Sequence, residues 1–554
     1  MNLLSKCLGK LLEWISTWMK CGLMRLCRVF ATASALPRRA SCQSTPEEWT
    51  SSMALRTYDA GGQSMVTVQT STHTFYVSTT RSCKMYREIV FDSLKCQRQV
   101  DLGGLSDCSQ YFRALSQSGM KETEDGLVCL DHVSSSAFYG LLEFYFRHTF
   151  RTPPEEELGL HIQASSYLLA ETFLAKCLSV LADVLRPENC LSYLSLAQEI
   201  CCVELRSTVL AYLSRNLLEL PHVIRRLTDQ EREELILLRT QGKPHLCSLR
   251  KENLTTWRDP ATERARHVFA LHGGGWRPIT EFPFTADKWS FSAVVMYNYL
   301  YIIGGYRTLA GRSWHFKMAS FRYNPLTQEW AAIAPLIKRR RHFSAVCCQG
   351  RIYAVGGWYL DSLLSPDSNT ALHTAVECYN PWEDTWRFVS SLPLTDFQFS
   401  VSLSHDVPLA TSLAHCLLVL GSIQRTGEKV LLQYHTEEDS WSELRPPLTR
   451  AHVHLPVLYF LGASADRLLV VGGDNSHNVM TSFCVRSQQW GQVHRLPKAA
   501  LVGQGTLVGQ QVLMASLEHN TVVTMDQQSL SFTTFPPLPT SVCYEAVFYL
   551  HIFL

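Results

Sequence analysis

The stretch Leu300-Tyr301-Ile302-Ile303-Gly304-Gly305 decides the fold, because its pattern returns along the second half of the chain. A short apolar run leads into two glycines, and Tyr323-Asn324-Pro325 followed by Trp330 completes the same unit. A continuous apolar run predicts a strand that is covered on both faces, and Asn-Pro predicts a tight turn. The tryptophan is expected to fill the space beside the neighbouring unit and to donate its indole N–H to a polar group.

Units of this kind recur six times from His267 onward. Their apolar runs, each followed by two small residues, are 268–271, 300–303, 352–355, 417–420, 468–471 and 512–514. Their aromatic residues, spaced 41 to 56 positions apart, are Trp289, Trp330, Trp386, Trp441, Trp490 and Phe532. A period near 50 residues predicts a propeller of six blades. The apolar stretch 542–549 has no unit of its own, and we expect it to complete the first blade and remove an exposed edge.

The first half of the chain has a helical pattern. Residues 155–240 contain few glycines, and apolar residues recur at three- and four-residue steps. In the window 186–205, Asn189 stands where a helix N-cap is expected, and Pro187 interrupts the preceding link. Cysteines 190, 201 and 202 are expected to be small core residues.

These patterns together resemble a known domain order. The repeat unit is similar to the Kelch repeat, and the window 186–205 is similar to the opening of a BACK domain. Tyr111-Phe112-Arg113-Ala114-Leu115, with 128–133 and 137–145, resembles a BTB domain. The order over about 65–554 resembles the Kelch-like family.

That resemblance implies a multidomain protein with three folded parts. They are an α/β BTB domain at 61–185, an all-α BACK helical domain at 186–262 and an all-β six-bladed Kelch propeller at 263–554. Residues 1–60 are expected to form a disordered leader, with a transit peptide or a membrane-surface helix as the alternatives.

The amino-terminal part departs from the usual BTB pattern. Strands are expected at Met65–Gln69 and Thr74–Val77, but 80–104 has no obvious family counterpart. Ahead of the Tyr111–Leu115 motif, Gly103 and Gly104 would each weaken a helix by about 1 kcal/mol relative to alanine. The family implies a homodimer through the BTB domain, and this departure leaves both dimerisation and cullin binding open.

The resemblance also implies a function, that of a substrate adaptor for a cullin-3 ubiquitin ligase. The cullin-binding candidates are Met120, Glu122, Tyr111 and Phe112. The candidates for binding a protein substrate are Trp276, Tyr306, Lys338, Arg339, Arg340, Trp358 and Asp474. Most follow glycine pairs, and the others belong to the cationic run 338–342, which favours an acidic or phosphorylated peptide. The alternative interpretation of that run is an ordinary solvated turn.

Composition excludes several other classes. The 554 residues are 46% hydrophobic and 18% charged, with a net charge of +2, so we expect folded cores and no nucleic-acid partner. No uncharged apolar run reaches 18 residues, which argues against a membrane partner. The 19 cysteines include no CxxC pair, which favours a reduced, cytoplasmic protein, and a nuclear location is also allowed.

No sequence motif indicates an enzyme. GxSxG, HExxH and phosphate-loop patterns are missing from the sequence, and no metal or cofactor is expected. A non-enzymatic adaptor is therefore the leading hypothesis. The alternatives are a scaffold that binds actin or another filament and, third, an enzyme.

Overall fold

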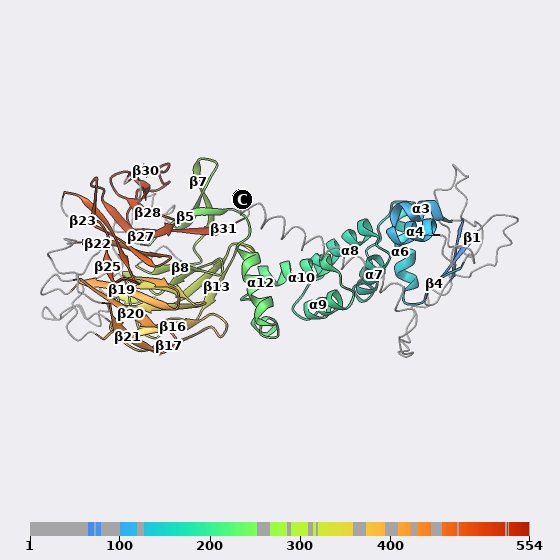
Figure 1. Ribbon diagram of the computed structural model, residues 1–554, viewed down its shortest axis with the longest axis horizontal. Coiled ribbons are helices and arrows are strands. Elements are labelled where there is room, and N and C mark those ends of the chain that lie inside the picture. The colour runs from blue at the N-terminus through green and yellow to red at the C-terminus, as the bar shows by residue number, and fades with distance from the viewer. Residues whose placement is uncertain are drawn as a thin grey trace. The chain divides into compact units, whose positions relative to one another are not determined.

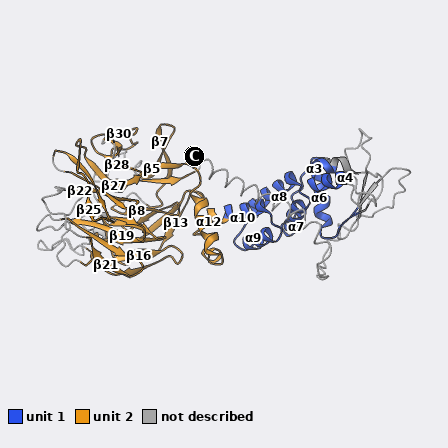
Figure 2. Cartoon of the chain, viewed as in Figure 1, with its two compact units in different colours: residues 1–212 blue, residues 213–554 orange. Residues whose placement is uncertain are grey.

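The structure is a computed structural model of the chain. It describes residues 65–70, 74–78, 100–118, 127–251, 266–284, 290–308, 314–316, 319–357, 373–393, 408–422, 429–444, 457–473, 476–526, 529 and 531–552. The chain divides into two compact units, residues 1–212 and 213–554 (Figure 2). The leader predicted at 1–60 lies outside the described residues.

Unit 1 begins with a small mixed sheet and helices. The sheet order is β3-β2-β1-β4, and β1 runs antiparallel to β2 and parallel to β4. Its strands are β1 (Met65–Thr70), β2 (Thr74–Ser78), β3 (Val100–Asp101) and β4 (Leu127–Leu130). Its first helices are α3 (Leu102–Cys108), α4 (Gln110–Ser118) and α6 (Ser135–Arg147). The two strands predicted at 65–69 and 74–77 and the helix over the Tyr111–Leu115 motif are confirmed.

A helix forms ahead of Tyr111 despite the two glycines. Gly103 and Gly104 lie within α3, where Leu105 is completely buried and Ser109 bonds the helix end to the carbonyl of Leu168. Burial of one apolar side chain contributes about 1.5–3 kcal/mol, which offsets the low propensity of the glycines.

A helical region follows. It comprises α7 (Glu155–Tyr167), α8 (Glu171–Val184), α9 (Cys190–Glu199), α10 (Val203–Arg215), α11 (Pro221–Ile224) and α12 (Asp229–Arg239). Asn189 is the N-cap residue of α9 as predicted, but its side-chain oxygen accepts the backbone N–H of Arg186 rather than one from α9. No helix in the described part of the chain is long and apolar enough to span a membrane.

Unit 2 is built mostly of strands (Figure 1). Its described residues form six blades, five with four strands and one with five. Blade 1 is β8 (Ser292–Met296), β9 (Tyr299–Ile303), β12 (Ser320–Asn324) and β13 (Glu329–Ile333). Blade 2 is β14 (Ser344–Cys348), β15 (Arg351–Val355), β16 (Val376–Asn380) and β17 (Thr385–Val389). Blade 3 is β18 (Leu409–Leu413), β19 (Cys416–Ser422), β20 (Lys429–His435) and β21 (Ser440–Glu443). Blade 4 is β22 (Val457–Ser464), β23 (Arg467–Gly473), β24 (Asn478–Cys484) and β25 (Gln489–Trp490), with β26 (His494–Leu496) also paired to β24.

The remaining two blades contain the carboxyl-terminal strands, and one of them also contains strands from the start of unit 2. Blade 5 is β27 (Leu501–Val508), β28 (Gln511–Ser516), β29 (Thr521–Asp526) and β30 (Phe532–Thr534). The closing blade is β31 (Glu545–His551), β5 (Pro244–Arg250), β6 (His267–His272) and β7 (Gly275–Glu281). The first strands of the blades contact one another in the cycle β8, β14, β18, β22, β27, β31 and back to β8. The ring is therefore closed, and the six-bladed propeller is confirmed.

The closing blade joins the carboxyl-terminal strand to strands from the start of unit 2. β31 pairs antiparallel with β5 from Glu545↔Arg250 to His551↔Pro244, so the predicted role of 542–549 is confirmed. Two sequence interpretations are corrected here. β5 lies within 186–262, the range expected to be helical, and β6 is the third strand of its blade rather than the glycine-bearing second strand.

The indole N–H groups show how neighbouring blades are fastened together. The Nε1 atoms of Trp330, Trp386 and Trp441 donate to Thr280 Oγ1, Ala334 O and Ser390 O of the preceding blade at 2.9, 2.9 and 2.8 Å. Trp276 in the closing blade donates likewise to Pro536 O at 2.9 Å. The equivalent tryptophan of that blade is therefore Trp276, not the predicted Trp289, which lies outside the described residues. The error arose because Gly273-Gly274 forms the turn between the third and fourth strands.

A buried ion pair lies on the seam between β31 and β5. Arg250 Nε and Glu545 Oε1 are 3.3 Å apart, and both side chains are almost completely buried. Burial raises the pKa of Glu545 to about 7, while Arg250 opposes that rise. A carboxyl with a raised pKa in the folded state stabilises the fold below its unfolded pKa, and this contribution is lost as pH rises through about 7.

We therefore expect the stability of the propeller to fall between about pH 4.5 and pH 7, by a contribution on the order of 2–3 kcal/mol from this carboxyl. Glu545→Gln, which cannot ionise, should flatten that part of the profile. The measurement is the melting temperature of the propeller transition at several pH values for both proteins. Identical pH profiles would contradict the assignment to Glu545.

Candidate protein-binding sites

Two sets of connections lie at the same end of the propeller blades. Because strands alternate in direction, links from second to third strands and links between blades emerge at one end. The cationic run Lys338–His342 belongs to this end, since it links blade 1 to blade 2. Lys338 and Arg339 are exposed there, so the structure permits both to contact a partner.

Arg340 is different, and its assignment to the substrate surface is wrong. Its side chain is completely buried, and Nη2 pairs with Glu377 Oε1 at 2.6 Å. Its Nη1 atom also donates to the carbonyl oxygens of Gly356 and Ala375 at 2.8 and 3.1 Å. Burial lowers the pKa of Arg340, and the Glu377 carboxylate opposes that change. Five N–H groups in a fixed fork make arginine suited to joining a carboxylate and several carbonyls at once.

The same Glu377 carboxylate fixes the start of the cationic run. It accepts the backbone N–H groups of Ile337 and Lys338 at 2.6 and 3.2 Å. The glycine pair of blade 2 packs against the end of the run, and a Cβ on Gly357 would lie 2.8 Å from Arg341 O. Arg340 and Glu377 thus position the backbone from which Lys338 and Arg339 project.

Of the other substrate-binding candidates, one is buried, one lies in the connection between two strands of blade 1 and two lie outside the described residues. Trp276 is nine-tenths buried and bonded to Pro536, so it fastens blades together and does not offer a free ring to a partner. Tyr306 begins β10 (Tyr306–Thr308), which pairs with β11 (Trp314–Phe316) between the second and third strands of blade 1. Trp358 and Asp474 lie outside the described residues. Tyr306, Trp358 and Asp474 stay predictions.

The cullin-binding candidates lie around α4. Phe112 is completely buried and packs against Tyr111 and Phe138, so it belongs to the core and its assignment as a contact residue is wrong. Tyr111 is half-buried, with its ring beside that of Tyr167. Met120 and Glu122 lie outside the described residues and stay predictions.

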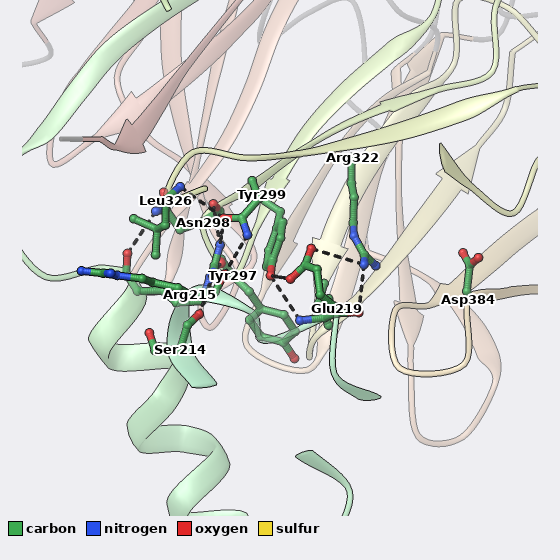
Figure 3. Close-up of polar contacts among 12 residues, drawn as sticks. Ser214, Arg215, Glu219, Tyr297, Asn298, Tyr299, Arg322, Leu326 and Asp384 are labelled. Atoms are coloured by element: carbon green, nitrogen blue, oxygen red, sulfur yellow. Dashed lines mark hydrogen bonds and ion pairs between the residues drawn. The ribbon is translucent and has the colours of Figure 1, made fainter. Parts of the chain in front are cut away.

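Sequence reasoning missed a polar anchor inside unit 2. It joins residues 214–240 to the turns at the other end of blade 1 (Figure 3). Arg239 is buried, with Nε bonded to Tyr297 O at 2.7 Å, Nη1 to Ser214 O at 2.6 Å and Nη2 to Asn324 Oδ1 at 2.9 Å. Its guanidinium carbon also lies 3.8 Å from the centre of the Tyr299 ring. Burial lowers the pKa of Arg239.

A second group of contacts strengthens this anchor. Tyr299 Oη donates to Glu219 Oε2 at 2.6 Å, and Arg322 Nη2 donates to Leu218 O at 2.8 Å. Asn324 Nδ2 donates to Arg215 O at 2.7 Å. The Asn-Pro turn in the sequence was a signal for Asn324, but nothing in the sequence marks Arg239 as buried. The last turns of the helical region are therefore fixed to the propeller.

Comparisons with known proteins agree with this architecture. Residues 97–184 match the BTB/POZ domain, and residues 339–393 match the Kelch motif. Kelch repeat and BTB domain-containing protein 13 of Homo sapiens is 24% identical over 447 residues, covering 77% of this chain and 85% of that protein.

Two relatives from Mus musculus match over shorter stretches. Kelch domain-containing protein 7A is 27% identical over 257 residues, or 46% of this chain and 29% of that protein. Kelch-like protein 42 is 27% identical over 289 residues, or 46% of this chain and 55% of that protein. The chain thus spans less than two thirds of the length of these two relatives. The solved structure of YjhT is 12% identical, with a TM-score of 0.36, over 49% of this chain and 92% of that one.

A BTB/POZ match in unit 1, a helical region and a closed ring of Kelch blades occur here in one chain. The chain is a BTB–Kelch protein.

Proposed function

We propose that this chain is a non-enzymatic substrate adaptor of a cullin-3 ubiquitin ligase. In this proposal the BTB domain binds the cullin and the propeller binds a protein substrate. The observation that carries it is the presence of both modules in one chain. Holding ligase and substrate together raises their effective concentration and so accelerates ubiquitin transfer.

The proposed substrate surface is the propeller end that carries Lys338 and Arg339. Two exposed cations on a loop held by a buried ion pair suit an acidic or phosphorylated segment, because charge-assisted bonds to carboxylate or phosphate are strong. Tyr306, Trp358 and Asp474 are proposed to contribute to the same surface. The proposed location is cytoplasmic, with a nuclear pool also allowed.

The first test is affinity purification of the full chain. Wild-type protein should retain cullin-3 in near-stoichiometric amounts. Met120→Asp and Glu122→Arg should each reduce the retained cullin at least about tenfold, because a mismatched charge in an interface costs several kcal/mol. Arg467→Glu, an exposed charge reversal at the start of β23 in the propeller, is the matched control and should retain cullin-3.

Melting temperature separates loss of contact from loss of folding. The two BTB variants should melt as the wild type does, whereas Phe112→Ala should lose about 3–5 kcal/mol of stability because it opens a core cavity. Wild-type protein that co-sediments with filaments and retains no cullin-3 would favour the scaffold alternative and refute the adaptor.

A further inference from the structure

A thiol and an imidazole face each other on two strands of blade 3. Cys416 begins β19 and His435 ends β20, and the two are directly paired in the sheet. Cys416 Sγ lies 3.5 Å from His435 Nδ1, which is close enough for the ring nitrogen to accept the thiol proton. Both side chains are half-buried, so the pair is accessible from solvent.

Two neighbouring side chains complete the arrangement. Gln433 lies two residues before His435 on the same face of β20, and its Nε2 donates to Cys416 Sγ at 3.1 Å. A donor aimed at sulfur stabilises the negative charge that forms when the thiol loses its proton. On the other side of the ring, His435 Nε2 lies 3.4 Å from the hydroxyl of Ser442, which is exposed on β21. The ring thus has a polar neighbour at each nitrogen.

Other thiols of the chain are in different surroundings. Burial raises the pKa of Cys348 and Cys108 to about 11 and that of Cys177 and Cys347 to about 12, so these thiols stay protonated at neutral pH. Cys484, which ends β24, has Asp466 and Ser487 as neighbours instead of an imidazole, and hydrogen bonds from Ser487 lower its pKa. A nucleophile beside a base, with a further group next to that base, is the arrangement that activates thiols.

We propose that Cys416 is a nucleophilic thiol that adds soft electrophiles of the α,β-unsaturated carbonyl class, with His435 as its proton acceptor. The thiol proton moves to His435 Nδ1 and the sulfur forms a bond to the β-carbon. The π electrons of the carbon–carbon double bond move onto the carbonyl group as an enolate. The imidazolium then returns the proton to the α-carbon, so the step is a net addition without an oxidant or a leaving group.

The test is a time course of labelling of the intact, folded chain with N-ethylmaleimide, followed by mass spectrometry of each cysteine peptide. Cys416 should react faster than Cys201, an exposed thiol that donates to the carbonyl oxygen of Gln198. His435→Ala should slow labelling at Cys416 about tenfold or more, and Gln433→Leu should also slow it. Labelling of Cys201 and Cys484 should stay within twofold, which controls for unfolding.

The pH profile gives an independent readout. The wild-type rate at Cys416 should depend less steeply on pH than the rate in His435→Ala, where the thiol must lose its proton to solvent. Equal rates at Cys416 in the wild type and in His435→Ala would overturn the proposal. So would labelling of Cys201 and Cys484 without labelling of Cys416.

Discussion

Deletion of residues 541–554 is expected to abolish the folded propeller. The deletion removes β31, whose Ala546, Val547, Phe548 and Leu550 are buried. Each buried apolar side chain larger than alanine contributes about 1.5–3 kcal/mol, so the sum is comparable with the whole stability of a domain, about 5–15 kcal/mol. β27 and β8 would also lose the strand between them, and the edge of β5 would be exposed.

The measurement is thermal unfolding of the full chain and of the truncated chain, monitored by the circular dichroism signal of β-sheet. The truncated chain should lack the propeller transition or melt at least about 10 °C lower. Ser541→Ala in the complete chain is the control, because this side chain is exposed and only its carbonyl bonds to Arg250. An unchanged melting temperature in the truncated chain would refute closure of the ring by β31.

Arg340→Leu is expected to destabilise the propeller by about 3–5 kcal/mol. The substitution leaves the Glu377 carboxylate buried without its cation, and such an uncompensated buried charge is strongly unfavourable. It also removes the donors to the carbonyl oxygens of Ala354, Gly356 and Ala375, so with the Glu377 carboxylate four acceptors lose a partner. The measurement is denaturant unfolding with the slope of the transition compared between variants.

The neighbouring residue offers a matched control. Arg339→Leu is the same chemical change at an exposed position, and its effect on the free energy of unfolding should stay within about 0.5 kcal/mol. The two substitutions should also differ in how they affect binding of a partner. Arg339→Leu should weaken an acidic partner without lowering the melting temperature. Equal loss of stability in both variants would show that burial of Arg340 is not what holds this loop.

The repeated pattern of apolar run, small pair and tryptophan was sufficient to predict the propeller. It could also predict that 542–549 joins the blade of the first repeat unit, which is the closing blade, because a strand without a blade leaves an unsatisfied edge. The second strand of that blade, β5, carries no glycine pair, so the repeated pattern does not mark it as a blade strand. Gly273-Gly274 lies between the third and fourth strands rather than after the second, so the pattern wrongly predicts Trp276 as a surface residue.

Burial within a charged run could not be predicted from the run itself. Lys338, Arg339 and Arg340 are adjacent cations, and only the distant Glu377 makes the third of them a buried residue. Arg239 poses the same difficulty, since it ends a helix rich in charged residues yet bonds three separate segments. The pairing of Cys416 with His435 likewise depends on the register of β19 and β20, which sequence alone does not fix.

The central claim is that this BTB–Kelch chain bridges a cullin and a substrate, and binding between purified components tests it most directly. The full chain would be titrated with the amino-terminal domain of cullin-3 in a calorimeter, and the mass of the complex measured by light scattering. The account predicts a complex with one cullin per chain, and at least a tenfold weaker complex for Met120→Asp. A correctly folded wild-type chain that shows no heat of binding and no complex at tens of micromolar would contradict it.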